Sequence, residues 1–163
     1  MWTDVVDLRD FYASALGRVA RRMIIRRLRL VWPDVRGLSI LGLGYATPLL
    51  GAFRGQAGRL MAMMPAMQGV LHWPTDGAGL TALVDEASLP LADRAVDRVI
   101  IAHALECAER TWPLMRELWR VLADDGRLIV IVPNRRGLWA HSERSPFGNG
   151  RPYSPGQLSK SLR

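Results

Sequence analysis

Short apolar runs alternate with helical segments between residues 36 and 134, and this alternation constrains the fold more than any other feature. The runs that read as buried strands are 38–41, 60–63, 80–84, 95–103 and 127–132. Helical spacing is predicted between them over 46–53 and 111–122, with a short helix or turn over 65–70. Strands without a polar side, separated by helices, predict a mainly parallel, doubly wound α/β sheet covered on both faces.

The segment before this region predicts one basic amphipathic helix over residues 3–31. Its apolar positions recur at helical spacing with arginines between them, and are Phe11, Leu16, Val19, Met23, Ile24 and Leu28. Trp32-Pro33 should end the helix, because the residue before a proline avoids the helical region. Such a helix can lie on a membrane surface, but packing against the rest of the domain is the favoured interpretation.

The length of 163 residues favours one domain, which we divide into three parts. Residues 1–35 form the basic helical segment, and residues 36–134 form the strand-and-helix core. Residues 135–163 begin as a loop rich in Gly, Pro, Arg and Ser, and a further helix is predicted to start at Pro155. Within the core, Asp124-Asp125-Gly126 predicts a turn before the last strand.

Composition excludes several classes of protein. A single cysteine, Cys107, rules out a disulfide framework or a cysteine-rich zinc site and fits a reducing, cytoplasmic location. The sequence has neither an apolar run long enough to cross a membrane nor the residue order of a signal peptide. The net charge of +7 suits nucleic acid or an anionic surface. Because the arginines are spread out, a nucleic-acid partner is kept as an alternative and is not favoured.

A glycine-containing segment, Gly42-Leu43-Gly44, follows the first apolar run and precedes the helix expected from Ala46. Glycine allows a sharp turn and a close approach of the backbone to a ligand. In open α/β sheets, ligands lie outside the carboxyl ends of the strands, near helix N-termini with free N–H groups. The segment therefore predicts the binding of an adenosine-containing cofactor.

The order of motifs further along the chain makes this expectation more specific. An acidic pair, Asp85-Glu86, is followed by Leu89-Pro90 and then by a strand that contains Asp97. After it come Arg116-Glu117-Leu118-Trp119-Arg120-Val121-Leu122 and the strand that begins at Gly126-Arg127-Leu128. Over residues 36–134 this order resembles the class I S-adenosylmethionine-dependent methyltransferases of the small-molecule type, which have a Rossmann-like fold.

The resemblance implies a role for individual residues. Gly42-Leu43-Gly44 would lie beneath the methionine part of S-adenosyl-L-methionine. Asp85 would accept a hydrogen bond from the adenine amino group, with Glu86 as its alternative. Ala102 and His103 would end the fourth strand beside the methyl-transfer centre. In such an enzyme the cofactor carries the reactive methyl group, and the protein supplies position and orientation.

The sequence also departs from the family pattern. Ile40 stands where the family usually has an acid, two positions before the first glycine, and Ala46 replaces the third glycine of the turn. The acid that usually holds the ribose hydroxyls is missing from residues 61–65. Its loss would cost about 1.5–3 kcal/mol of binding. The strand hairpin that ends the family sheet is also absent, so the interpretation that the chain is a fragment or a truncated form stays open. For the missing acids, three interpretations stay open: cofactor binding is weak, other residues compensate, or catalysis has been lost.

Few side chains suggest chemistry of their own. His103 is a candidate general base, because the pKa of an imidazole suits proton transfer near neutral pH. Glu106 could orient His103 or cap the next helix. Cys107 is expected to be a buried, inert thiol, although a nucleophilic role is the alternative. The three histidines show no spacing typical of metal ligands.

The loop after the fifth strand combines cationic and aromatic side chains. Arg135, Arg136, Trp139, Arg151 and Tyr153 are the candidate substrate-binding residues. Such side chains suit a flat anionic substrate or stacked RNA bases, and a purely structural loop is an equal alternative.

The sequence thus predicts an S-adenosylmethionine-dependent methyltransferase that acts on a small molecule. One alternative is a noncatalytic methyltransferase-like module that binds a ligand or partner, which the missing acids favour. A less favoured alternative is an RNA-binding or RNA-methylating protein, which the positive charge suggests.

Overall fold

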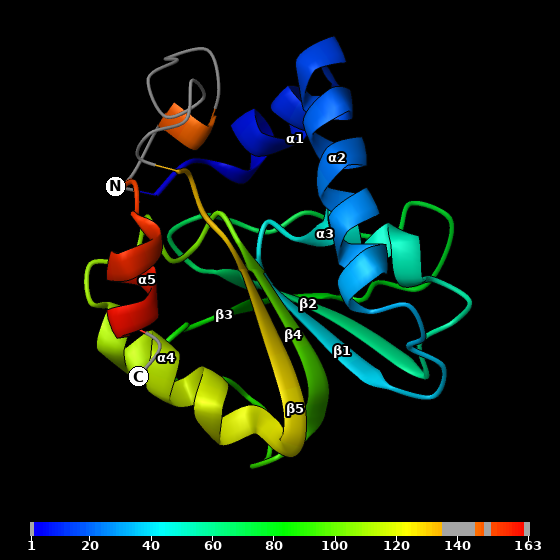
Figure 1. Ribbon diagram of the computed structural model, residues 1–163. Coiled ribbons are helices and arrows are strands. Elements are labelled where there is room, and N and C mark those ends of the chain that lie inside the picture. The colour runs from blue at the N-terminus through cyan, green and yellow to red at the C-terminus, as the bar shows by residue number, and fades with distance from the viewer. Residues whose placement is uncertain (1, 135–145, 149–150, 162–163) are drawn as a thin grey trace.

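The computed structural model describes residues 2–134, 146–148 and 151–161 (Figure 1). The sheet has five strands, and all neighbours pair in parallel in the order β3-β2-β1-β4-β5. The strands are β1 Ser39–Gly44, β2 Arg59–Pro65, β3 Thr81–Val84, β4 Val96–Ala102 and β5 Leu122–Ile131. Each predicted strand is present, and the prediction of a mainly parallel sheet is confirmed.

Helices cover both faces of this sheet. α4, Thr111–Val121, packs on one face, while α2, Ala15–Val31, and the short α3, Thr47–Leu50, pack on the other. The strands supply both cores by alternation, because successive side chains point to opposite faces. In β1, for example, Leu41 and Leu43 contact the α4 side, and Ile40 contacts the α2 side. The predicted doubly wound, Rossmann-like architecture is therefore confirmed.

The predicted single helix over 3–31 is wrong in one respect, because the chain forms two helices there. α1, Val5–Ala13, ends at Ser14, where the backbone is extended. The Ser14 side chain accepts a hydrogen bond from the Gly17 N–H at 3.1 Å and so caps the start of α2. The second helix ends before Trp32-Pro33, as predicted. Apolar residues keep a helical spacing across the break at Ser14, so their spacing alone could not reveal it.

The predicted turn at Asp124-Asp125-Gly126 is also wrong, because these residues lie inside β5. Val96 pairs with Leu122 and Arg98 with Arg127, so Asp97 alone lies opposite residues 123–126. The strand therefore bulges where a turn was expected. A carboxylate oxygen of Asp97 accepts a hydrogen bond from the Ser39 N–H at 2.8 Å, which fixes the start of β1 beside β4.

The C-terminal part of the described chain returns to the sheet. The predicted helix at Pro155 is present as α5, Pro155–Ser161. Tyr153 forms an isolated parallel bridge with Asn134, just beyond β5. In the part of the chain that the structure describes, no helix is long and apolar enough to span a membrane.

Candidate functional site at the carboxyl edge of the sheet

The glycine segment is placed differently from the prediction. Gly42, Leu43 and Gly44 all lie within β1, and the chain begins to turn at its last residue, Gly44, whose φ is 82°. A Cβ at Gly42 would lie 2.8 Å from the Cβ of Ala46. A Cβ at Gly44 would overlap the carbonyl oxygen of Ala102 and lie 2.8 Å from the Cβ of Ala104. Both glycines are therefore required for contacts within the protein itself.

The end of β4 carries the most unusual local structure of this edge. The carbonyl of the buried Ala102 accepts a hydrogen bond from the Tyr45 N–H at 2.9 Å. His103 follows with φ at 55°, a conformation uncommon for a residue other than glycine. Its backbone carbonyl accepts a hydrogen bond from the Gln68 side-chain amide at 2.7 Å. The left-handed turn directs the histidine ring into the protein, where it is only 2 % exposed.

His103 lies between a tyrosine and a carboxyl group. Its Nε2 is 2.8 Å from the Tyr12 hydroxyl, and its Nδ1 is 3.7 Å from Oε1 of Glu106. Burial lowers the pKa of His103 to about 4 and raises the pKa of Glu106 to about 7. Burial, followed by the nearby Glu106, also raises the pKa of Tyr12. The imidazole is therefore neutral, and the direction of its hydrogen bond with the Tyr12 hydroxyl depends on which ring nitrogen carries the proton.

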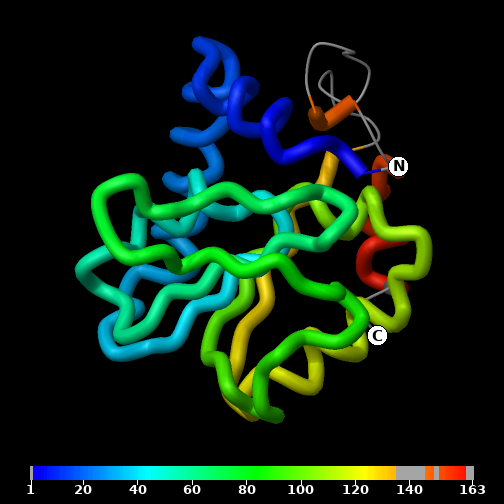
Figure 2. Tube along the Cα trace, turned by 180° about the vertical axis from the view of Figure 1, so that it is seen from behind, coloured from blue at the N-terminus to red at the C-terminus, as the bar shows by residue number. Residues whose placement is uncertain are grey.

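An apolar cluster covers this edge, and we call it the edge cluster. It consists of Val5, Leu8, Phe11 and Tyr12 from α1, Ala20 from α2, Tyr45 after β1, and Met64 of β2. The Val5 N–H also donates to the carbonyl of Gln68 at 2.9 Å. Figures 1 and 2 show α1 lying across the ends of the strands from either side. The N-terminal helix therefore covers the edge at which ligands of such sheets bind.

The candidate adenine-binding residues follow β3 at the same edge. Asp85 is exposed, and its Oδ1 accepts a hydrogen bond from the Ala87 N–H at 2.8 Å. Glu86 is half-buried. An ionised carboxylate has about four acceptor positions, so Asp85 keeps capacity for a ligand donor.

Two motifs of the sequence resemblance are in direct contact behind these residues. Glu117 Oε2 accepts a hydrogen bond from the Leu89 N–H at 2.8 Å. Arg120 donates to the carbonyls of Leu89 and Leu91, at 3.0 and 2.8 Å, and forms an ion pair with Glu117. This pairing holds the Leu-Pro segment against α4. The arginine and glutamate of α4 were part of the recognised pattern, but the pattern did not indicate this contact.

The residues fit S-adenosylmethionine at the adenine end of the expected site and do not fit it at the ribose and methionine ends. Asp85 suits the adenine amino group because it is exposed and can accept further hydrogen bonds. The end of β2, where a ribose-binding acid would stand, is buried and carries Met63, Met64 and Pro65. Beyond Gly44, where the methionine part would lie, Tyr45 and His103 are covered by α1. The ribose and methionine ends of the expected site are thus closed in this arrangement.

The candidate substrate-binding residues are only partly within the described chain. Arg135, Arg136 and Trp139 lie outside the described residues. Arg151 is exposed, and its backbone N–H donates to the carbonyl of Glu106 at 2.9 Å. Tyr153 is half-buried, and its N–H donates to the carbonyl of Pro133 at 3.2 Å. The structure therefore brings Arg151 near Glu106 through the backbone.

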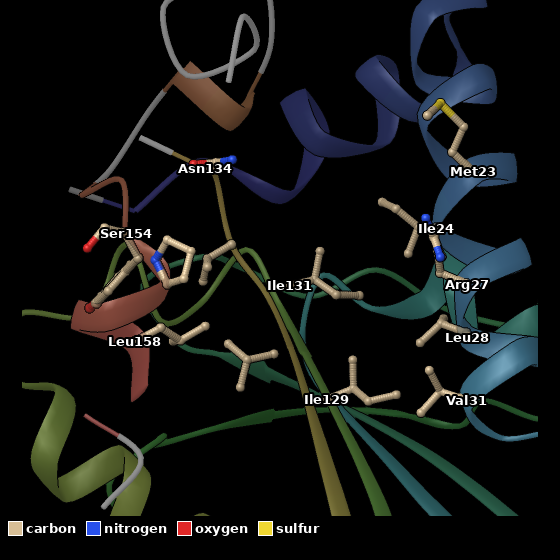
Figure 3. Close-up of a pocket in the computed structure, with 14 residues that line it drawn as sticks. Met23, Ile24, Arg27, Leu28, Val31, Ile129, Ile131, Asn134, Ser154 and Leu158 are labelled. Carbon is tan, nitrogen blue, oxygen red and sulfur yellow. The ribbon is translucent and has the colours of Figure 1, made fainter. Parts of the chain in front are cut away.

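A large groove of about 580 Å³ lies elsewhere, between α2 and α5 along β5 (Figure 3). Its floor includes Ile129 and Ile131, and its walls include Met23, Val31 and Leu158. This groove is apolar, and Gly44, Asp85 and His103 do not line it.

Sequence reasoning named His103 and Glu106 but missed Tyr12 and Gln68. No local pattern could have found them, because Tyr12 is 91 residues from His103 and Gln68 is 35 residues from it. Cys107 is buried, as predicted, and burial raises the pKa of its thiol.

Comparison with known proteins finds one matching family model and many solved structures with a similar fold. Residues 62–130 match the family model described as methyltransferase domain. An S-adenosylmethionine-dependent methyltransferase of Thermotoga maritima superposes with a TM-score of 0.72 at 16 % identity, covering 98 % of this chain and 75 % of the other. No curated protein matches the sequence significantly.

Two further solved structures widen the range of activities on this fold. The protein complexed with the methyltransferase activator Trm112 of Haloferax volcanii has a TM-score of 0.65 at 18 % identity, covering all of this chain and 76 % of the other. The [4+2]-cyclase SpnF has a TM-score of 0.64 at 19 % identity, covering 92 % of this chain and 58 % of the other. The predicted resemblance is confirmed: the chain has the class I S-adenosylmethionine-dependent methyltransferase fold, and its residues 62–130 match the methyltransferase domain family.

Proposed function

We propose that the protein is an S-adenosylmethionine-dependent methyltransferase that acts on a small molecule. The exposed Asp85 at the carboxyl edge is the observation that carries this proposal, because it offers a free acceptor where adenine would lie. The motif order over 85–133 resembles the enzymes that act on small molecules. When bound, the cofactor would supply an activated methyl group.

The covered edge implies that α1 must leave its place for the cofactor to bind. Tyr12 contacts Tyr45 and His103, just beyond the ends of β1 and β4, and Leu8 is buried in the same edge cluster. Binding then selects the conformation in which α1 is undocked, and its apparent affinity is reduced by the rarity of that conformation. In the undocked form, the ring of His103 would be free to position an acceptor or take its proton.

A substitution that weakens the packing of α1 on the edge of the sheet is therefore expected to tighten cofactor binding. Leu8 is fully buried in the edge cluster, so Leu8→Ala should destabilise the docked helix by about 2–5 kcal/mol. We expect this variant to bind S-adenosylhomocysteine at least about tenfold more tightly than the wild type in isothermal titration. Leu114→Ala is the matched control, because Leu114 is equally buried but packs α4 on the opposite side of the molecule.

The outcomes of this titration separate the proposals. Tighter binding by Leu8→Ala and not by Leu114→Ala supports both the cofactor and the role of α1. Equal binding by all three proteins would show that α1 does not close the site. If the folded Leu8→Ala protein does not bind at millimolar ligand, the chain is not a methyltransferase.

A second titration assigns the adenine contact. Asp85→Asn keeps the hydrogen bond to the Ala87 N–H but removes the charge, so we expect about tenfold weaker binding of S-adenosylhomocysteine. Glu86→Gln is the control and should leave the affinity unchanged. A reversal of the two effects would assign the contact to Glu86.

A noncatalytic module that binds a ligand or partner is the second candidate. The buried apolar end of β2 and the edge cluster favour it, because both replace polar surface that the cofactor would need. This candidate predicts no methyl transfer to any substrate and no binding of S-adenosylhomocysteine, even when α1 is weakened.

A further inference from the structure

The outer face of α2 carries positive charge that the described part of the chain does not compensate. The helix has 17 residues and no acidic one, and its arginines are Arg18, Arg21, Arg22, Arg26, Arg27 and Arg29. None of them forms an ion pair within the described residues. Like charges four residues apart on a helix repel each other, as Arg18, Arg22 and Arg26 do here. A partner that neutralises them would remove this cost.

The same face exposes an apolar row, which we call the α2 stripe. It consists of Leu16, Val19, Met23 and Leu30, which are 44 %, 42 %, 63 % and 68 % exposed. Their spacing of three, seven and fourteen residues from the first places them on one side of the helix. The side that packs on the protein is a different one, formed by Gly17, Ala20 and Leu28. The helix thus has one apolar side that packs on the core and a second apolar side that faces solvent.

Arginines stand on both sides of the α2 stripe. Arg22 and Arg26 lie along one side of it and Arg27 along the other, by their positions in the helical repeat. All three are exposed, and none makes a hydrogen bond within the described residues. An apolar row between arginines is the arrangement of helices that lie in the plane of a membrane surface.

We propose that the outer face of α2 docks on an anionic lipid bilayer. The α2 stripe would enter the boundary between headgroups and acyl chains, and the flanking arginines would bind lipid phosphates. Figure 1 shows α2 along the outer side of the molecule, with its first turns extending beyond the sheet. The apolar surface continues past the stripe, since Met23 and Val31 also line the groove along β5 (Figure 3).

A bilayer fits this face better than nucleic acid does. On a phosphate backbone the α2 stripe would stay in water, because only base stacking or insertion between bases buries apolar side chains there. The helix has no aromatic side chain to stack on bases. The proposal is independent of methyl transfer, because the edge that would hold the cofactor does not include the α2 stripe.

Vesicle co-sedimentation tests the proposal with the full chain. We expect binding to vesicles of equal parts phosphatidylcholine and phosphatidylglycerol, weaker binding in high salt, and none to phosphatidylcholine alone. An arginine near an anionic surface contributes about fivefold to binding, so Arg22→Gln with Arg26→Gln should lower the partition coefficient about 25-fold. Met23→Ser with Leu30→Ser should lower it at least about tenfold.

Matched controls remove the same groups from elsewhere on the surface. Arg110→Gln with Arg127→Gln takes away two exposed arginines outside α2 and should leave most of the binding intact. Trp112→Ser with Trp119→Ser removes exposed side chains of α4, on the opposite face of the sheet, which are 70 % and 51 % exposed. Circular dichroism of each variant confirms that it is folded.

Three results would overturn the proposal. The first is no binding of the wild type to anionic vesicles. The second is binding that the tryptophan variant abolishes and the α2 variants do not. The third is binding to RNA of mixed sequence at salt concentrations where vesicles are not bound, with loss in the arginine variant alone.

Discussion

Replacing Gly44 with alanine is expected to lower the free energy of unfolding by about 4 kcal/mol. The residue has a φ of 82°, which costs an alanine about 1–2 kcal/mol. The added Cβ would also overlap the Ala102 carbonyl and lie 2.8 Å from the Cβ of Ala104, so that β1 and β4 must separate locally. Urea denaturation followed by circular dichroism measures the loss.

Gly37→Ala provides the control for the backbone contribution. Gly37 has a similar φ of 74°, but a Cβ there has no neighbour within 4 Å. We expect a loss of about 1–2 kcal/mol, from the backbone conformation alone. Equal losses in the two variants would show that the close approach of β1 to β4 contributes nothing. That result would reopen a ligand as the reason for glycine at position 44.

The second large effect concerns pH and the buried pair of His103 and Glu106. Burial lowers the pKa of His103 from 6.5 to about 4 and raises the pKa of Glu106 from 4.5 to about 7. Between pH 4.5 and 6.5 the unfolded chain holds the proton on the histidine, and the folded chain holds it on the glutamate. Because both states then bind one proton, the pair contributes almost no pH dependence to the free energy of unfolding in this range.

Removing either partner should expose the pH dependence of the other. In Glu106→Gln, His103 binds a proton more readily when unfolded. Stability is then complete above pH 6.5 and should fall by on the order of 3 kcal/mol as the pH decreases toward 4. In His103→Asn, which tolerates the left-handed backbone, Glu106 should give the opposite slope. Stability would then be complete below pH 4.5 and fall as the pH rises through 7.

Urea denaturation at a series of pH values measures these slopes for the wild type and both variants. Parallel curves for all three proteins would contradict the proposed burial of the pair. Tyr12→Phe is a useful reference, because it removes the hydroxyl beside Nε2 and leaves both titrating groups in place.

The fold could be predicted because its signals are local. A run of apolar residues marks each strand, and a stripe that includes Leu114 and Leu118 marks α4. The residues at which each strand begins and ends were harder to predict, because they depend on pairing across the sheet. Gly42 became part of β1 since it pairs with Ala62 and Ile100, and Asp124-Asp125-Gly126 became a bulge since β5 continues to pair on either side of it.

The candidate site was harder to predict because its surroundings come from distant parts of the chain. His103 and Asp85 were identified from motif order, which depends on the residues at the end of each strand. That α1 would cover the edge could not be inferred, since Leu8 and Phe11 fit a helix that packs on any apolar surface. Tyr12 contacts His103 only because the chain brings together residues that are 91 positions apart.

That separation also bears on the order in which the protein can mature during synthesis. α1 leaves the ribosome well before its hydrogen-bonding partners Gln68 and His103 are made. Closing so long a loop costs conformational entropy before the contact repays it. The nascent α1 and the arginine-rich α2 therefore remain without their final contacts until β4 emerges. During that interval they are open to chaperones and to anionic surfaces, and slowing translation before residue 103 would extend the exposure.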